Sequence, residues 1–134
     1  MRRKLCCTAS LFVAVTLIAN AGSQLTHEAV LKETLGALEK LSATLAGIRD
    51  AETAKLAQSD LRKSADQWKA LMKKAEELPP PNKEEKEKLE KAYAPKLEEA
   101  RRKLFGEVDR VRSVAGGREA LQVIDAVLNR KPKR

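Results

Sequence analysis

Few side chains in this sequence have the type and spacing that catalysis or metal binding requires. His27 is the only histidine, and Leu31 stands four residues later, so the His-Glu-x-x-His pattern of zinc enzymes is absent. Glu98 and Glu99 are adjacent carboxylates, but neighbouring side chains diverge on a helix and each has a basic partner four residues on. We therefore expect a surface histidine, solvated ion pairs, and no catalytic, metal-binding or cofactor-binding residue.

Thiol and serine chemistry are also not indicated. Cys6 and Cys7, the two cysteines, lie in the N-terminal segment described below and would leave with it. No serine stands in a Gly-x-Ser-x-Gly elbow, and Gly116-Gly117 lacks the Gly-Lys-Ser/Thr of a phosphate loop. We expect a protein that is not an enzyme and whose stability comes from packing alone.

The N-terminus has the three parts of a secretory signal. A basic stretch, Met1 to Lys4, runs into the apolar segment Leu5 to Ala19, and the small residues Ala19 and Ala21 form the peptidase recognition triplet. The alternative is a membrane anchor, but the apolar segment is shorter than the roughly 20 residues that span a bilayer. The sequence thus predicts cleavage after Ala21, export to the periplasm or beyond, and no stable membrane insertion of the mature chain.

The formal charge of +8 is concentrated at the two ends of the chain. Residues 22–129 are nearly neutral, with acidic and basic residues alternating as on a solvated helix surface. Nucleic-acid binding needs basic residues gathered on one face of a domain, so we expect none. The basic tail, Arg130 to Arg134, is predicted to be disordered. Its four basic residues predict only a weak attachment to anionic surfaces.

The first two elements are predicted to be long amphipathic helices. Residues 26–48 begin at a capping threonine, Thr26, and residues 51–78 contain the only tryptophan, Trp68, in an alanine-rich stripe. Apolar residues recur at helical spacing in both segments: Leu31, Leu38 and Leu45 in the first, and Ala54, Leu61, Trp68 and Ala75 in the second.

The third helix is the best marked in the sequence. Pro79 to Pro81 end the second helix, and Asn82 with Glu85 resembles a capping box that starts a helix reaching about Ser113. Pro95 removes one backbone hydrogen bond, so we expect a kink there. The outer face offers four acid-before-base pairs at i,i+4: Glu84–Lys88, Glu87–Lys91, Glu98–Arg102 and Glu99–Lys103.

A last short helix is predicted over residues 119–129, after the Gly116-Gly117 break. Its apolar surface is too large to leave in water, so it either closes the bundle or meets a partner. We take Leu121, Ile124 and Leu128 as a candidate interaction surface.

The expected fold of the whole chain is all-α. After the signal peptide (1–21), residues 22–129 form an elongated antiparallel three-helix bundle, a coiled-coil-like rod with a short fourth helix. Residues 130–134 form the tail.

Two stretches of the sequence carry a resemblance: Leu41 to Lys63, with Ile48-Arg49-Asp50-Ala51-Glu52 at its centre, and Leu78 to Leu104, with Lys91-Ala92-Tyr93-Ala94-Pro95. They resemble a group of small exported helical proteins common in planctomycete-type bacteria. The resemblance implies export and an all-helical fold, but it supplies no activity, cofactor or site residue.

Function is therefore expected to rest on binding rather than chemistry. The first hypothesis is a protein-interaction module, an adaptor, scaffold or holdase, whose partner is another envelope protein or a second copy of the chain. The alternative is a weak binder of an anionic envelope surface or polymer that attaches through the basic tail.

Overall fold

The computed structural model describes residues 25–129, and all regular secondary structure in that range is α-helical, which confirms the all-α prediction. The elements are α1 (His27–Ala46), α2 (Ala51–Glu77), α3 (Lys83–Arg112), α4 (Gly117–Gln122) and α5 (Asp125–Leu128). The predicted signal peptide with Ala19 and Ala21, and the basic tail, lie outside the described residues.

Hydrogen-bonding side chains set the starts of the three long helices. Thr26 caps α1 by accepting a hydrogen bond from the backbone N–H of Ala29, as predicted. Asp50 and Thr53 form a full capping box at α2, in which each side chain accepts from the other residue's backbone N–H at 2.8 and 3.0 Å. Asn82 accepts from the backbone N–H of Glu85 at 2.8 Å and so caps α3.

The proline-containing loop between α2 and α3 ends α2, as the sequence indicates. Leu78, just before the three prolines, takes an extended conformation, because a residue before proline is driven out of the helical region.

Farther along the chain, α3 continues through Pro95 as one element, with that proline exposed. Three of the four predicted ion pairs form on the exposed face of α3: Glu84–Lys88, Glu98–Arg102 and Glu99–Lys103.

The chain beyond α3 differs from the prediction, because two short helices replace the single one expected over residues 119–129. The backbone tightens at Val123 and Ile124, whose N–H groups bond three residues back, and Ile124 itself leaves the helical region at φ −109°. Two consecutive β-branched residues favour this break. It turns the chain so that Ile124, which is fully buried, and Val127 both reach the core.

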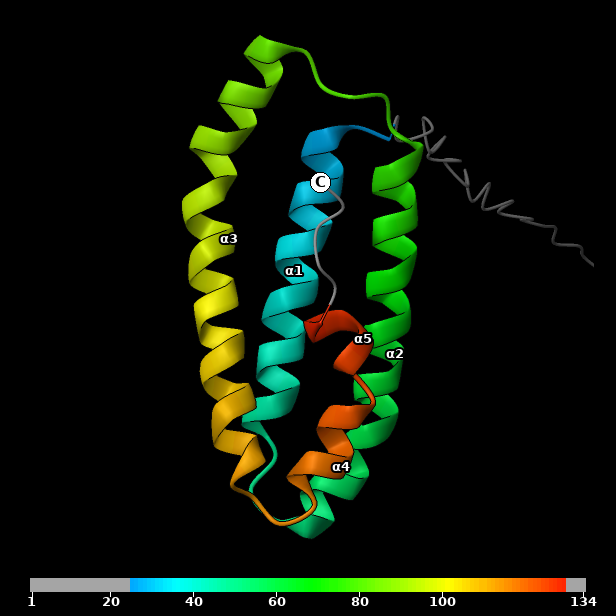
Figure 1. Cartoon of the computed structure of the whole chain (residues 1–134), viewed down its shortest axis with the longest axis vertical. Coiled ribbons are helices and arrows are strands. Elements are labelled where there is room, and N and C mark those ends of the chain that lie inside the picture. The colour runs from blue at the N-terminus through cyan, green and yellow to red at the C-terminus, as the bar shows by residue number, and fades with distance from the viewer. Residues whose placement is uncertain (1–24, 130–134) are drawn as a thin grey trace, which may run out of the picture.

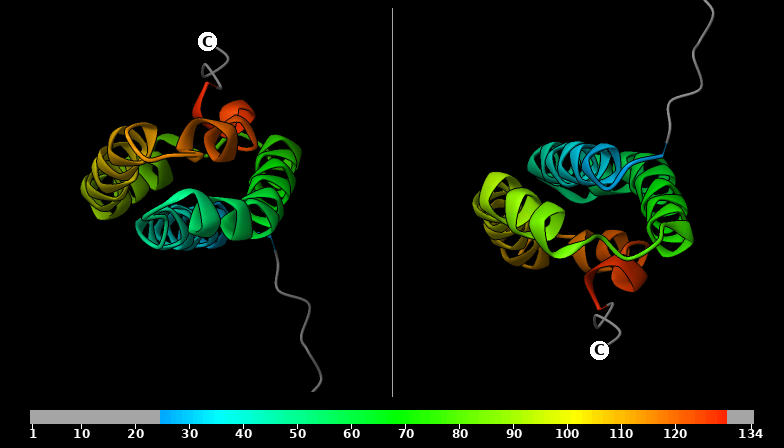
Figure 2. Two further views of the ribbon diagram at one scale, coloured as in Figure 1. Left: turned by 90° about the horizontal axis from the view of Figure 1, so that it is seen from below. Right: turned by 90° about the horizontal axis from the view of Figure 1, so that it is seen from above.

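In the view of Figure 1, α1 lies between α3 and α2. α1, α2 and α3 run in alternating directions, and α1 packs against both of the others, whereas α2 and α3 barely contact each other. In a compact three-helix bundle each helix would contact the other two. Here α4 lies between α2 and α3 and closes the ring seen in the end views (Figure 2).

The core lies where α4 and α5 close this ring. Its fully buried side chains come from every part of the fold: Leu45 and Ile48 at the end of α1, Leu61 of α2, Val108 and Val111 of α3, and Ile124. Trp68 packs against this cluster from α2 and is half-buried, so it fills space beside the alanines as expected.

An arginine from α3 closes the C-terminal end of α1. The Arg110 guanidinium donates to the carbonyl oxygens of Ile48 and Leu45 at 2.8 and 2.7 Å, and Glu107 pairs with it at 2.7 Å. Carbonyls at the end of a helix lack the usual partner four residues on, so this contact gives the Ile48 carbonyl a donor and adds a second one to the Leu45 carbonyl, which also accepts from the Ile48 N–H. It also fixes the lower end of α3 against α1.

Candidate functional site

A mostly apolar groove lies at the end of the molecule that carries the proline loop, and we call it the open-end groove. Its volume is about 300 Å³. Its walls come from the first two turns of α1, the last turns of α2, the proline loop and the first half of α3. The lining residues are His27, Val30, Leu31, Ala75, Leu78, Pro81, Lys86, Leu89, Glu90, Tyr93, Ala94 and Leu97.

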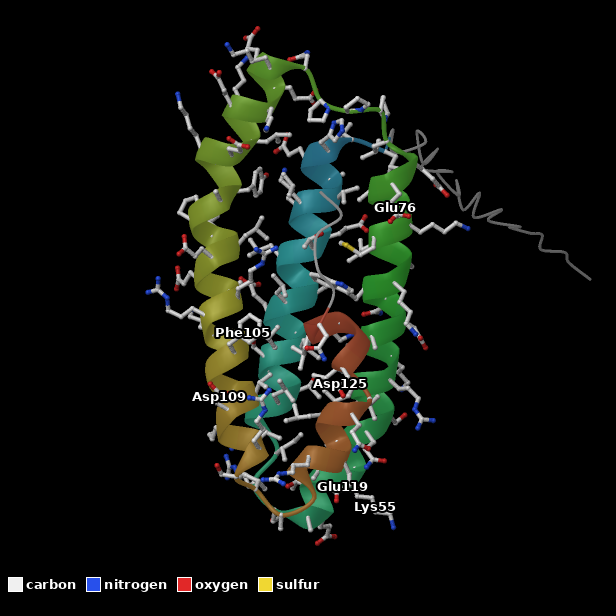
Figure 3. All side chains as sticks on the ribbon, viewed as in Figure 1. Lys55, Glu76, Phe105, Asp109, Glu119 and Asp125 are labelled. Carbon is white, nitrogen blue, oxygen red and sulfur yellow. The ribbon has the colours of Figure 1, made fainter. Side chains whose placement is uncertain are left out.

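The groove exists because α4 and α5 cover only part of the seam between α2 and α3. α4 contacts both of these helices, but α5 makes extensive contact only with α2. Figure 3 shows Glu76 of α2 near the proline-loop end, whereas Glu119 and Asp125 of the α4–α5 segment lie toward the other end. The seam is therefore closed at one end and open at the other.

The long wall of the groove is a single helical stripe on α3. Its members follow spacings of three and four residues from Lys86 to Leu97, which places them on one face. Farther along, the same face buries Ala100, Leu104 and Val108 in the core. The groove lining is thus the uncovered continuation of the surface on which the core is built.

His27 holds the mouth of the groove together. Its Nε2–H donates to the carbonyl oxygen of Pro79 at 2.7 Å, and its Nδ1 lies 3.1 Å from Oε1 of Glu85. A carbonyl oxygen can only accept, so the hydrogen of this contact is on Nε2. The expected surface histidine is therefore a half-buried tether between α1, the proline loop and α3. The capping box expected at the start of α3 forms only in part. Asn82 accepts from the backbone N–H of Glu85, but the Glu85 side chain contacts His27.

A second polar contact crosses the groove floor. The buried Tyr93 hydroxyl donates to Oε1 of Glu28 at 3.0 Å, and the same oxygen lies 2.9 Å from Nζ of Lys32. The Lys32 ammonium and then the Tyr93 hydroxyl lower the pKa of Glu28, while burial and the Glu28 carboxylate raise the pKa of Tyr93. These groups tie α3 to α1 and leave apolar ring surface toward the groove.

The three residues predicted as an interaction surface lie elsewhere. Leu121 and Ile124 are buried in the core, and the half-buried Leu128 packs against it. Of the two alternatives for the last helical segment, the structure shows the one that closes the fold on itself. The sequence-based choice of these side chains as a free surface is therefore corrected for Leu121 and Ile124, which are buried within the fold, whereas Leu128 keeps part of its surface exposed.

The described residues offer few other sites. Within residues 25–129, no three His, Cys, Asp or Glu side chains gather closely enough to hold a metal ion. Glu98 and Glu99 are exposed and pair with Arg102 and Lys103 at 3.9 and 2.9 Å, as the sequence indicates. None of the helices in this range combines the length and apolar character needed to cross a bilayer.

Comparisons of this chain with protein-family models, with curated proteins and with solved structures found no match. The resemblance to exported planctomycete-type helical proteins stays a prediction. The open-end groove is therefore the feature of the molecule from which a function can be proposed.

Proposed function

We propose that the protein is an exported, non-catalytic module that binds another protein through the open-end groove. In this account, cleavage after Ala21 releases an elongated antiparallel bundle with coiled-coil-like packing, and the partner is an envelope protein. The observation that carries the proposal is the uncovered apolar stripe on α3, which continues the α3 face that packs in the core against α1 and α4.

The energetics favour an occupant. Leu31, Leu89 and Leu97 are only partly buried in the groove, so an occupant would cover the apolar area that they still expose. Each would contribute only a fraction of the about 1.5–3 kcal/mol that full burial of an exposed leucine is worth. A contiguous apolar surface of this kind marks an interaction site more often than isolated exposed side chains do. Leu56, 71% exposed on another part of α2, is such an isolated side chain.

The test is to place charge in the groove without disturbing the fold. Ala75 and Ala94 are exposed alanines on opposite walls, so the double variant Ala75→Glu/Ala94→Glu keeps the helices and adds two carboxylates to the groove. The matched control is Ala70→Glu/Ala92→Glu, which changes exposed alanines of the same two helices outside the groove.

Each version of the full chain, including residues 1–21, carries a C-terminal tag and is cross-linked gently in the producing cells and purified, and bound proteins are quantified by mass spectrometry. We expect a partner that is captured by wild type and by the control and is lost from the groove variant. Equal capture by all three chains would contradict binding through the groove.

The basic tail supports a second candidate function, attachment to an anionic envelope surface. Four of its five residues are basic and follow a nearly neutral body. Each such residue near an anionic membrane contributes about 1 kcal/mol, so attachment would be weak. Deleting Arg130 to Arg134 should abolish sedimentation with anionic liposomes at low salt. Sedimentation that persists without these residues would contradict attachment through the tail.

A further inference from the structure

We infer that the occupant of the open-end groove is a short amphipathic helix from the partner, lying along the α2–α3 seam in line with α4 and α5. The inference rests on the proposed function, that the groove binds a protein, and specifies which kind of protein segment it takes.

The groove offers an occupant side chains rather than backbone groups. Its three walls are helices, whose backbone N–H and C=O groups already bond within each helix. The loop adds three consecutive prolines, which have no N–H, and the Pro79 carbonyl is already bonded to His27. An extended peptide would leave its own backbone groups unpaired here, whereas a helix satisfies them internally.

The seam already accepts a helix at its other end. Over the closed half, α4 contacts both α2 and α3, and its Leu121 side chain is buried. Because α2 and α3 barely contact each other, the space between them suits a helix rather than a single inserted side chain. The docking surface of α4 and α5 is thus continuous with the open-end groove.

The lining specifies the size and pattern of this helix. The stripe from Lys86 to Leu97 spans about 16 Å at 1.5 Å per residue, which matches about three helical turns. Ala75 and Ala94 on opposite walls leave room for large apolar side chains of the partner. We therefore expect apolar residues at i, i+3 or i+4, and i+7, on a segment of about 11–14 residues.

A selection identifies the occupant class directly. A displayed library of peptides of about 14 residues, with all positions varied, is selected on residues 22–134, a chain that contains the whole described fold. Enriched peptides are synthesised, and circular dichroism reports whether they become helical on binding. Binding is then compared for wild type, Ala75→Glu/Ala94→Glu and Ala70→Glu/Ala92→Glu, with dodecanoate tested as a hydrocarbon ligand.

The inference predicts peptides with the i, i+3/i+4, i+7 apolar pattern that bind as helices. Their affinity should fall at least about tenfold in the groove variant, because the new carboxylates would be desolvated, and change less than about twofold in the control. Extended or proline-rich peptides, no enrichment, or saturable binding of dodecanoate alone would each overturn it. If partner capture still depends on the groove in those cases, the proposed function stands and only the helical occupant is rejected.

Discussion

Among the glycines of residues 25–129, Gly117 has the least room for an added methyl group. A Cβ built there would lie 1.9 Å from the carbonyl oxygen of Val111, a backbone atom that cannot move away without shifting the end of α3. Its neighbour Gly116 has φ +73°, a conformation that favours glycine. This pair turns the chain back toward the core, and the turn depends on both residues.

Gly117→Ala should therefore lower the free energy of unfolding by about 2–3 kcal/mol, in the range of overpacked sites. Urea denaturation followed by the fluorescence of Trp68, the only tryptophan, measures the change. Gly106→Ala is the control, since a Cβ at Gly106 meets nothing within 4 Å and α3 should gain about 0.5–1 kcal/mol. Equal effects of the two substitutions would contradict the clash.

Asp50 makes the stability of the α2 start depend on pH. Hydrogen bonds from the backbone N–H and then the hydroxyl of Thr53 lower the pKa of the Asp50 carboxyl below its ordinary 3.8. The unfolded chain therefore takes up the proton first as pH falls. The stabilisation is complete above the unfolded pKa and is lost as pH falls through the folded pKa.

Asp50→Asn removes this titration while retaining a side-chain oxygen for the cap. We expect the stability difference between wild type and variant to shrink as pH falls from 6 to below 3.8, in denaturation curves measured at several pH values. A difference that stays constant over this range would show that the capping box does not depend on the carboxylate charge.

At the scale of elements, the contact between Arg110 and the end of α1 joins two helices that are distant in sequence. Replacing the guanidinium leaves the Ile48 carbonyl without its observed partner and removes one of the two donors to the Leu45 carbonyl. Arg110→Met, which keeps the apolar stem, should cost about 1–3 kcal/mol in thermal or urea unfolding. Arg112→Met is the control, since Arg112 is exposed and pairs only with Asp109, and it should stay within about 0.5 kcal/mol.

The α4–α5 segment should behave as part of the core. Ile124 is fully buried among side chains of the main cluster, so Ile124→Ala should lower stability by about 2–4 kcal/mol. The exposed Leu56, changed to alanine, should have an effect of less than about 0.5 kcal/mol. A neutral Ile124→Ala in urea denaturation would mean that the segment is not docked in solution.

Across the whole molecule, local signals in the sequence predict the helices well. Thr26, Asn82 and the three prolines mark helix boundaries within one or two residues of those observed, because capping and proline act over a few bonds. The Asp50 capping box is equally local, since Asp50 and Thr53 stand three residues apart at the start of α2.

Long-range features were not predictable in the same way. His27 becomes a tether only because folding brings Pro79 and Glu85 to it, and Arg110 meets α1 only when α3 packs there. The open-end groove carried one readable signal. The apolar stripe of α3 begins at Leu89, far before the part that a short last helix can cover, so an excess of apolar surface was present in the sequence.

The most direct test of groove binding is photo-cross-linking from single positions in the producing cells. A benzoylphenylalanine at position 94 lies in the groove, and one at position 70 lies on exposed α2 surface outside it. The account predicts one recurrent cross-linked protein from position 94, lost when Ala75→Glu is added, and none from position 70. Cross-links of equal yield from both positions, or from position 70 alone, would contradict the groove as the binding surface.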